Sequence, residues 1–326
     1  MTFKFAMKHL LLPILMLSIV FSCKNDNDLE ARIAEIDNNV MVERFDLLAS
    51  KTNLKDLPAL RKAYPFMFSE NYTDSTWAET KKDTLQLQLY AEVSKVFSDF
   101  SETEKEIESL FNHIKYYFPE FNPPRVITTT SYVDYRNKIF VSDTIDVIAL
   151  DTYLGGEHEF YANIPKYIRE DLTKEQIVVD LAGEYSKRYI YQKPNKTFLD
   201  EMIYFGKQLY FKDAVVPFKT ESQRIGYSQE GLNWAMANES LIWIYFVERE
   251  LLFSTDAKLL GRFINPAPFS KFYLEEIDAA SPGRLGQYIG WQIVRAYMEQ
   301  NDVTLKQMLI TSTEDIFNNS KFKPRK

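Results

Sequence analysis

A single cysteine, Cys23, stands in this chain of 326 residues, directly after an apolar segment near the amino end. A basic start with Lys4 and Lys8 leads into the run LLLPILMLSIVF, from Leu10 to Phe21. This run is too short to span a bilayer, which takes about 20 apolar residues, and its basic start is typical of a secretory signal peptide. We therefore expect the body of the protein outside the cytoplasm. With only one cysteine it has no internal disulfide and must fold through its hydrophobic core alone.

The sequence Val20-Phe21-Ser22-Cys23 resembles the lipobox of bacterial lipoproteins, where a small residue precedes a cysteine that becomes the lipidated amino terminus. A lone cysteine is more often a small buried hydrophobe, but its position after a signal-like segment favours lipidation. We predict a signal peptide over residues 1–22, diacylglycerol and an acyl chain such as palmitate on Cys23, and a polar tether over 23–30. Beyond this covalent lipid we expect no cofactor.

The net charge of the chain is −7, and loss of the two signal-peptide lysines makes it about −9. A negative body argues against binding nucleic acid or anionic lipid headgroups. Contact with the membrane is therefore expected through the lipid anchor. The remaining length of about 300 residues is enough for a sizeable core.

The pattern of apolar residues divides the body in two. Residues 31–122 show helical periodicity and are predicted to form a helical amino-terminal region, closed by Pro123-Pro124. Residues 123–326 begin with β-branched runs at 126–133, 138–142 and 146–151, which short spacers favour as antiparallel neighbours. We predict an α+β fold, mostly helical, with a small antiparallel sheet preceding the main helices.

Several helices are predicted after the sheet. Residues 173–176 read as a capping box that starts a helix, a second helix spans about 197–211, and 228–253 is expected to be helical and buried on most of its circumference. Gly286 and Gly290 lie on one face of a further helix, where they permit close approach of another backbone. An amphipathic helix over 302–318 ends the chain.

Histidine offers little to a catalytic or metal site. His9 lies in the signal segment, His113 is expected to be a satisfied, partly buried side chain in a helix, and His158 to be an isolated, solvated loop residue. We predict no catalytic residue and no metal ligand.

The order of several short segments resembles the gliding-motility lipoprotein GldB family of Bacteroidetes. These segments are residues 151–155, 181–185, 230–232 and 282–290. The resemblance implies a degenerate relative of zincin-like metallopeptidases, whose active helix carries His-Glu-x-x-His. Laid over that motif, residues 183–187 read Gly183-Glu184-Tyr185-Ser186-Lys187.

The departures from that motif decide the chemistry. Glu184 stands where the general base would be and Glu230 where a third ligand would be, so both are candidates for a vestigial site. Gly183 has no ligating group and Lys187 carries an ammonium, so zinc is not expected here. Glu184 with Lys187 or Arg188 is more simply a surface ion pair.

The resemblance implies a lipid-anchored, non-enzymatic protein that supports the gliding machinery and associated protein secretion. It would act with other gliding or secretion proteins of the envelope, at the periplasmic face of the outer membrane. Two alternatives stay open. One is a peptidase or other hydrolase with an unrecognised active site, and the other is a carbohydrate-binding lipoprotein whose aromatic side chains stack on sugars.

Overall fold

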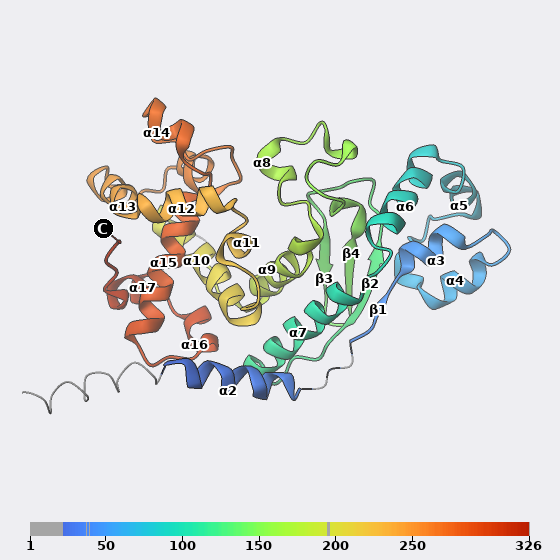
Figure 1. Ribbon diagram of the computed structural model, residues 1–326, viewed down its shortest axis with the longest axis horizontal. Helices are drawn as coiled ribbons and strands as arrows, with labels where there is room; N and C mark the ends of the chain where they lie inside the picture. Colours follow the sequence, from blue (N-terminus) through green and yellow to red (C-terminus); the bar gives the residue numbers. More distant parts are fainter. Residues whose placement is uncertain (1–21, 37, 39, 194–195, 326) are drawn as a thin grey trace, which may run out of the picture.

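The computed structural model describes residues 22–36, 38, 40–193 and 196–325 (Figure 1). The predicted signal peptide lies outside this part of the chain, apart from Ser22. Among the described helices, none combines the length and the apolar character needed to cross a bilayer.

The amino-terminal region is helical, as the periodicity predicts, and it also supplies one short strand that we did not predict. Its elements are α2 (Ser22–Ala34), β1 (Val42–Glu43), α3 (Phe45–Lys51), α4 (Leu57–Ala63), α5 (Asp74–Thr80), α6 (Thr84–Val96) and α7 (Ser101–Tyr117).

Helix α2 includes the segment that we interpret as a tether, residues 23–30. The helix packs on α7, with Ile33 only 2% exposed and the Glu30 carboxylate 3.3 Å from the ring of His113. His113 also contacts the Ser109 carbonyl oxygen at 2.7 Å, so it is the satisfied, buried histidine that the sequence predicts.

The sheet has four strands in the order β1, β2 (Arg125–Thr129), β4 (Ile145–Ala149) and β3 (Ile139–Val141). The three strands predicted from the β-branched runs are present, but our prediction that they are antiparallel neighbours holds for β3 and β4 and is wrong for β2. β2 runs parallel to both β1 and β4, and only β3 and β4 are antiparallel. The sheet is therefore mixed, with β3 at one edge.

The turn after β2 explains this topology. The carboxylate of Asp151, which follows β4, accepts hydrogen bonds from the backbone N–H groups of Ser131 and Val133 at 2.9 and 2.7 Å. These bonds hold residues 131–133 near the end of β4, so the chain passes beyond β4 before it returns as β3. Asp151 is buried, which raises the pKa of its carboxyl group.

The sheet separates two cores. On β2, Val126 packs into the large core with α7 and α9, whereas Ile127 packs into a smaller cluster with residues of α3 and α4. This alternation follows from the two-residue period of a strand. The large core continues through residues of the carboxy-terminal half as far as Ile316 and so joins that half to the sheet.

The carboxy-terminal half is helical. It comprises α8 (Lys166–Arg169), α9 (Ile177–Tyr189), α10 (Phe198–Val215), α11 (Glu221–Ile225), α12 (Gln229–Ala237), α13 (Glu239–Glu248), α14 (Glu275–Ala280), α15 (Leu285–Gln300), α16 (Leu305–Ile310) and α17 (Thr313–Ser320). Helices α10 and α15 cross at the centre of this half (Figure 1).

The crossing depends on glycines, as predicted for Gly290. A Cβ atom on Gly290 would stand 1.8 Å from the carbonyl oxygen of Met202, and one on Gly206 would stand 2.3 Å from that of Gly290. The two backbones are thus in direct contact, and no larger side chain fits between them.

Three details of the predicted helices are wrong. The Thr173 side chain makes no capping bond, because the first turn of the segment is a 3₁₀ turn and Gln176 is turned inward, where it donates to the Gln223 carbonyl oxygen at 3.3 Å. The stretch 228–253 is two helices, α12 and α13, that meet at Asn238. The stretch 302–318 is likewise broken between α16 and α17.

Helix α13 is also less buried than predicted. Ile242 and Phe246 face the core, but Leu241, Ile244 and Val247 are exposed. The helix lies at the outer side of the carboxy-terminal half (Figure 1), so only one side of it faces the core.

Candidate functional site

Helix α9 positions the candidate site. Its apolar face is buried as predicted, with Val178, Leu181, Ala182 and Tyr185 fully enclosed. The opposite face carries Asp180, Gly183, Glu184 and Lys187, spaced three or four residues apart, so that they lie on one side of the helix.

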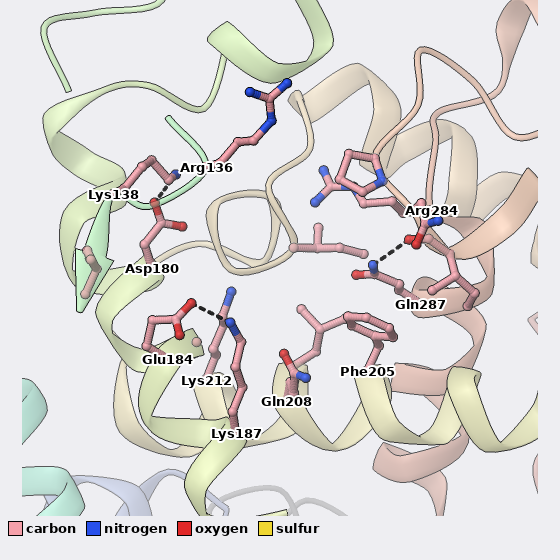
Figure 2. A pocket seen from close by; sticks show the side chains of 17 residues that line it. Arg136, Lys138, Asp180, Glu184, Lys187, Phe205, Gln208, Lys212, Arg284 and Gln287 are labelled. Atoms are coloured by element: carbon pink, nitrogen blue, oxygen red, sulfur yellow. Dashed lines mark hydrogen bonds and ion pairs between the residues drawn. The ribbon is translucent and has the colours of Figure 1, made fainter. Parts of the chain in front are cut away.

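This face borders a cavity of about 290 Å³, shown in Figure 2. Residues from α9 and the start of β3 line one side of it, and residues from α10 and the amino end of α15 line the other. The charged side chains around it are Arg136, Lys138, Asp180, Glu184, Lys187, Lys212 and Arg284. Gln208, Asn265 and Gln287 add amide groups.

Both carboxylates in the lining are already engaged. Asp180 pairs with Lys138 and accepts a hydrogen bond from the Tyr153 hydroxyl at 2.9 Å. Glu184 pairs with Lys187, three residues further along α9, which is the surface pair that the sequence predicts. The Glu184 carboxylate therefore already has a cation as its partner.

Lys212 reaches the cavity from α10. Its Nζ donates to the Arg224 carbonyl oxygen at 3.1 Å, and no carboxylate of the described residues lies within ion-pair distance of it. Burial lowers the pKa of Lys212 to about 8, because the charged form is poorly solvated.

Arg284 closes the other end of the cavity. Its guanidinium donates to the Gly226 carbonyl oxygen and lies 3.9 Å from the carboxylate of Asp171. Burial raises the pKa of Asp171 to about 6, although Arg284 acts in the opposite direction. Arg284 has φ of +61° and precedes α15, so the backbone turn at this residue fixes where its side chain begins.

The structure does not bring the two predicted site glutamates together in this cavity. Glu184 lines it, but Glu230 lies exposed in the first turn of α12 and lines a separate hollow beside Tyr227 and Pro282. Pro266 and Arg284 border both hollows.

The donors around α9 do not fit zinc. Gly183 offers no ligand, and the ammonium groups of Lys187 and Lys212 would repel a divalent cation. Elsewhere in the described part of the chain, no group of three or more His, Cys, Asp or Glu side chains is placed to hold a metal ion.

His158 differs from the prediction of an isolated, solvated side chain. The ring is 13% exposed, its Nε2 lies 3.4 Å from the Glu92 carboxylate, and its Nδ1 accepts from the Phe160 backbone N–H. The side chain therefore has a local structural role at the start of a 3₁₀ turn.

Of the cations that line the cavity, only Lys187 was singled out from the sequence, as part of a surface ion pair. Lys138 precedes a strand, Arg136 lies in a loop, and Lys212 is the one charged residue in the segment LYFK of an apolar helix face. Lys212 was the residue that could have indicated the cavity from the sequence, because a lysine among buried residues needs either a partner or access to water.

Comparison with protein families decides the affiliation of this chain. Residues 26–324 match the family described as gliding motility protein GldB. The chain belongs to this family. GldB membership implies a role in gliding motility and an association with the cell envelope. No curated protein and no solved structure matches the chain, and the relationship of the GldB fold to zincins stays a prediction.

Proposed function

We propose that this GldB-family protein is a lipid-anchored, non-catalytic component that supports the gliding machinery and the associated protein secretion. It does so by holding a segment of a partner protein at the cavity beside α9. The family match supports the motility role. The apolar segment before Cys23 supports the lipid anchor, and the family's envelope association supports a location at the periplasmic face of the outer membrane.

The pairing of the charged side chains in the cavity supports the proposal that the protein is not a hydrolase. Hydrolysis by a metallopeptidase needs a metal-bound water, and hydrolysis through Glu184 or Glu230 would need that carboxylate to be free to accept a proton. Here Glu184 is paired with Lys187, and Lys212 lies against Gly183. Glu230, the other candidate carboxylate, lies outside the cavity.

The edge of the sheet supports binding of an extended segment. In the β3–β4 pair, Lys138 accepts from the Ala149 N–H and Ser142 donates to the Ile145 carbonyl oxygen. The alternation of an antiparallel ladder then directs the backbone groups of Ile139 and Val141 away from β4. An extended peptide can pair with such an edge.

The test is a gene deletion scored for colony spreading and complemented with the wild type or with Cys23→Ala. We expect the deletion to abolish spreading, the wild type to restore it, and Cys23→Ala to restore it poorly because the protein loses its anchor. Crosslinking followed by pull-down from the complemented strain should recover an envelope protein. A deletion strain that spreads normally would contradict the motility role, and stoichiometric zinc in the purified protein would revive the hydrolase alternative.

A further inference from the structure

We propose that the cavity beside α9 binds an acidic peptide, with at least two carboxylate side chains of the segment entering among Arg136, Lys212 and Arg284. This inference rests on the proposed function, because it names the chemistry of the segment that the cavity would hold.

The charge balance of the lining is the first reason. Five cations, two from the loop before β3 and three from α9, α10 and the start of α15, face two carboxylates. Because Lys138 pairs with Asp180 and Lys187 with Glu184, three cations are left over, namely Arg136, Lys212 and Arg284. Of these, Arg284 has, among the described residues, only the distant Asp171 as a counter-charge, at 3.9 Å. A cavity with this surplus attracts anions.

The placement of Lys212 is the second reason. Its aliphatic chain passes over Gly183, where an added Cβ would stand 3.3 Å from Lys212 Cε. A side chain at position 183 would therefore narrow the space through which Lys212 reaches the cavity. Its ammonium is desolvated without an ion pair in the described residues, and a carboxylate entering the cavity would offset that cost.

The arrangement of the cations favours a peptide over a larger polyanion. Figure 2 shows Lys212 beside Glu184 and Lys187. Arg136 lies near the start of β3 and Arg284 lies at the α15 side, so the three cations are spread around the cavity. The cavity holds about 290 Å³, which suits a few side chains, and the edge strand β3 borders it through Ile139. The net charge of the whole chain is −7, so a long polyanion would meet repulsion beyond the cavity.

The peptide would lie along β3 with alternate side chains turned toward the cavity. Side chains of an added strand point to opposite faces in turn. Ile139 lies on the face that borders the cavity, whereas Phe140 is 62% exposed on the other face. A segment with acidic residues at every second position would therefore place its carboxylates on one side.

The experiment measures fluorescence anisotropy of a labelled hexapeptide of alternating valine and glutamate, with its glutamine counterpart as the neutral probe. The protein is the mature lipoprotein purified in detergent. We expect the glutamate peptide to bind, the glutamine peptide to bind at least about tenfold more weakly, and the affinity to fall as salt rises from about 0.05 to about 0.5 M.

Two variants of the protein complete the test. Arg136→Gln/Lys212→Met should weaken binding of the glutamate peptide at least about tenfold, and Arg136→Gln alone should weaken it by a smaller factor. Arg136 is exposed and forms no ion pair among the described residues, so this single variant is expected to fold normally. The matched control is Arg249→Gln/Lys258→Met, which changes the same residue types at exposed positions outside the cavity.

The outcomes separate this inference from the proposed function. Equal binding of the two peptides, or unchanged binding by the cavity variants, would overturn the acidic-peptide inference. So would binding of a sulfated polysaccharide such as heparin in place of the peptide. If the protein binds neither peptide but still restores spreading to the deletion strain, the inference is wrong and the motility role stands.

Discussion

Lys212 of α10 lies across from Gly183 of α9, so close that a Cβ on Gly183 would stand 3.3 Å from its Cε and 3.6 Å from its Nζ. Glycine at this position leaves room for a long cationic side chain that reaches the cavity. The same position, laid over His-Glu-x-x-His, is where a metallopeptidase has its first histidine. Glycine at position 183 therefore offers no metal ligand and leaves room for a positive charge.

Lys212 should make the free energy of unfolding depend on pH in the alkaline range. The pKa of Lys212 is lowered from 10.5 to about 8, so between these values the unfolded chain holds a proton that the folded protein has released. The free energy of unfolding consequently rises with pH over that range. Lys207, with its pKa also lowered to about 8 by burial, contributes in the same direction.

Replacing Lys212 by methionine should reduce that rise. We expect Lys212→Met to be at least as stable as the wild type near pH 7. At about pH 9.5 the wild type should have gained stability relative to the variant. Urea unfolding of both proteins at the two pH values measures the difference. Lys258→Met, at an exposed position, should follow the wild type. An identical pH dependence in Lys212→Met and wild type would show that Lys212 is not desolvated.

Asp146 should make stability depend on pH in the acidic range. It is buried on β4, Tyr185 donates to its Oδ2 at 2.7 Å, and its Oδ1 has no hydrogen-bond partner in the part of the chain that the structure describes. Burial raises the pKa of Asp146 from 3.8 to about 7. Because the folded pKa lies above the unfolded one, this group stabilises the protein fully below about pH 4, and that contribution is lost as pH rises to 7.

Asp146→Asn should therefore weaken the decline in unfolding free energy between about pH 4 and 7. The decline should persist in part, since Asp171 has a raised pKa as well. Thermal unfolding of both proteins across this range measures the difference. If the unfolding free energy of Asp146→Asn falls with pH as steeply as that of the wild type, Asp146 is ionised over the whole of this pH range.

Gly290→Ala should destabilise the protein by at least about 2 kcal/mol, because the new methyl group would overlap the carbonyl oxygen of Met202 and force α10 and α15 apart. Gly261→Ala is the matched control, since a Cβ there meets no atom within 4 Å. It should change the free energy of unfolding by less than about 0.5 kcal/mol. Equal effects in urea titrations would mean that the helices do not cross this closely.

Cys23→Ala should release the protein from the membrane. Without a cysteine to receive lipid, the chain has no predicted anchor, and no described helix can span a bilayer. Fractionation of cells should then find wild type with membranes and the variant in the soluble fraction. Membrane retention of Cys23→Ala at the wild-type level would contradict lipidation as the anchor.

The sequence predicted elements whose signals are local. The apolar face of α9 and the glycines of α15 follow from spacing along one helix, and both were predicted correctly. The neighbours of β2 depend instead on bonds from Ser131 and Val133 to Asp151, about 20 residues away, which no local pattern shows.

The site was predicted less well, for the same reason. The pair of Glu184 with Lys187 lies within one helix turn and was expected. Arg136, Lys212 and Arg284 come from a loop, α10 and the turn before α15, and only the packing of the whole chain brings them to one cavity. Glu230 was placed by motif order alone, and motif order does not determine whether two carboxylates share a pocket.

The most direct measurement is colony spreading of the deletion strain complemented, at equal protein level, with Glu184→Ala/Glu230→Ala or with Arg136→Gln/Lys212→Met. If the protein acts by binding through the cations of the cavity, the glutamate variant will spread like the wild type and the cation variant will not. Failure of the glutamate variant together with normal spreading of the cation variant would contradict that mechanism and assign the function to the carboxylates.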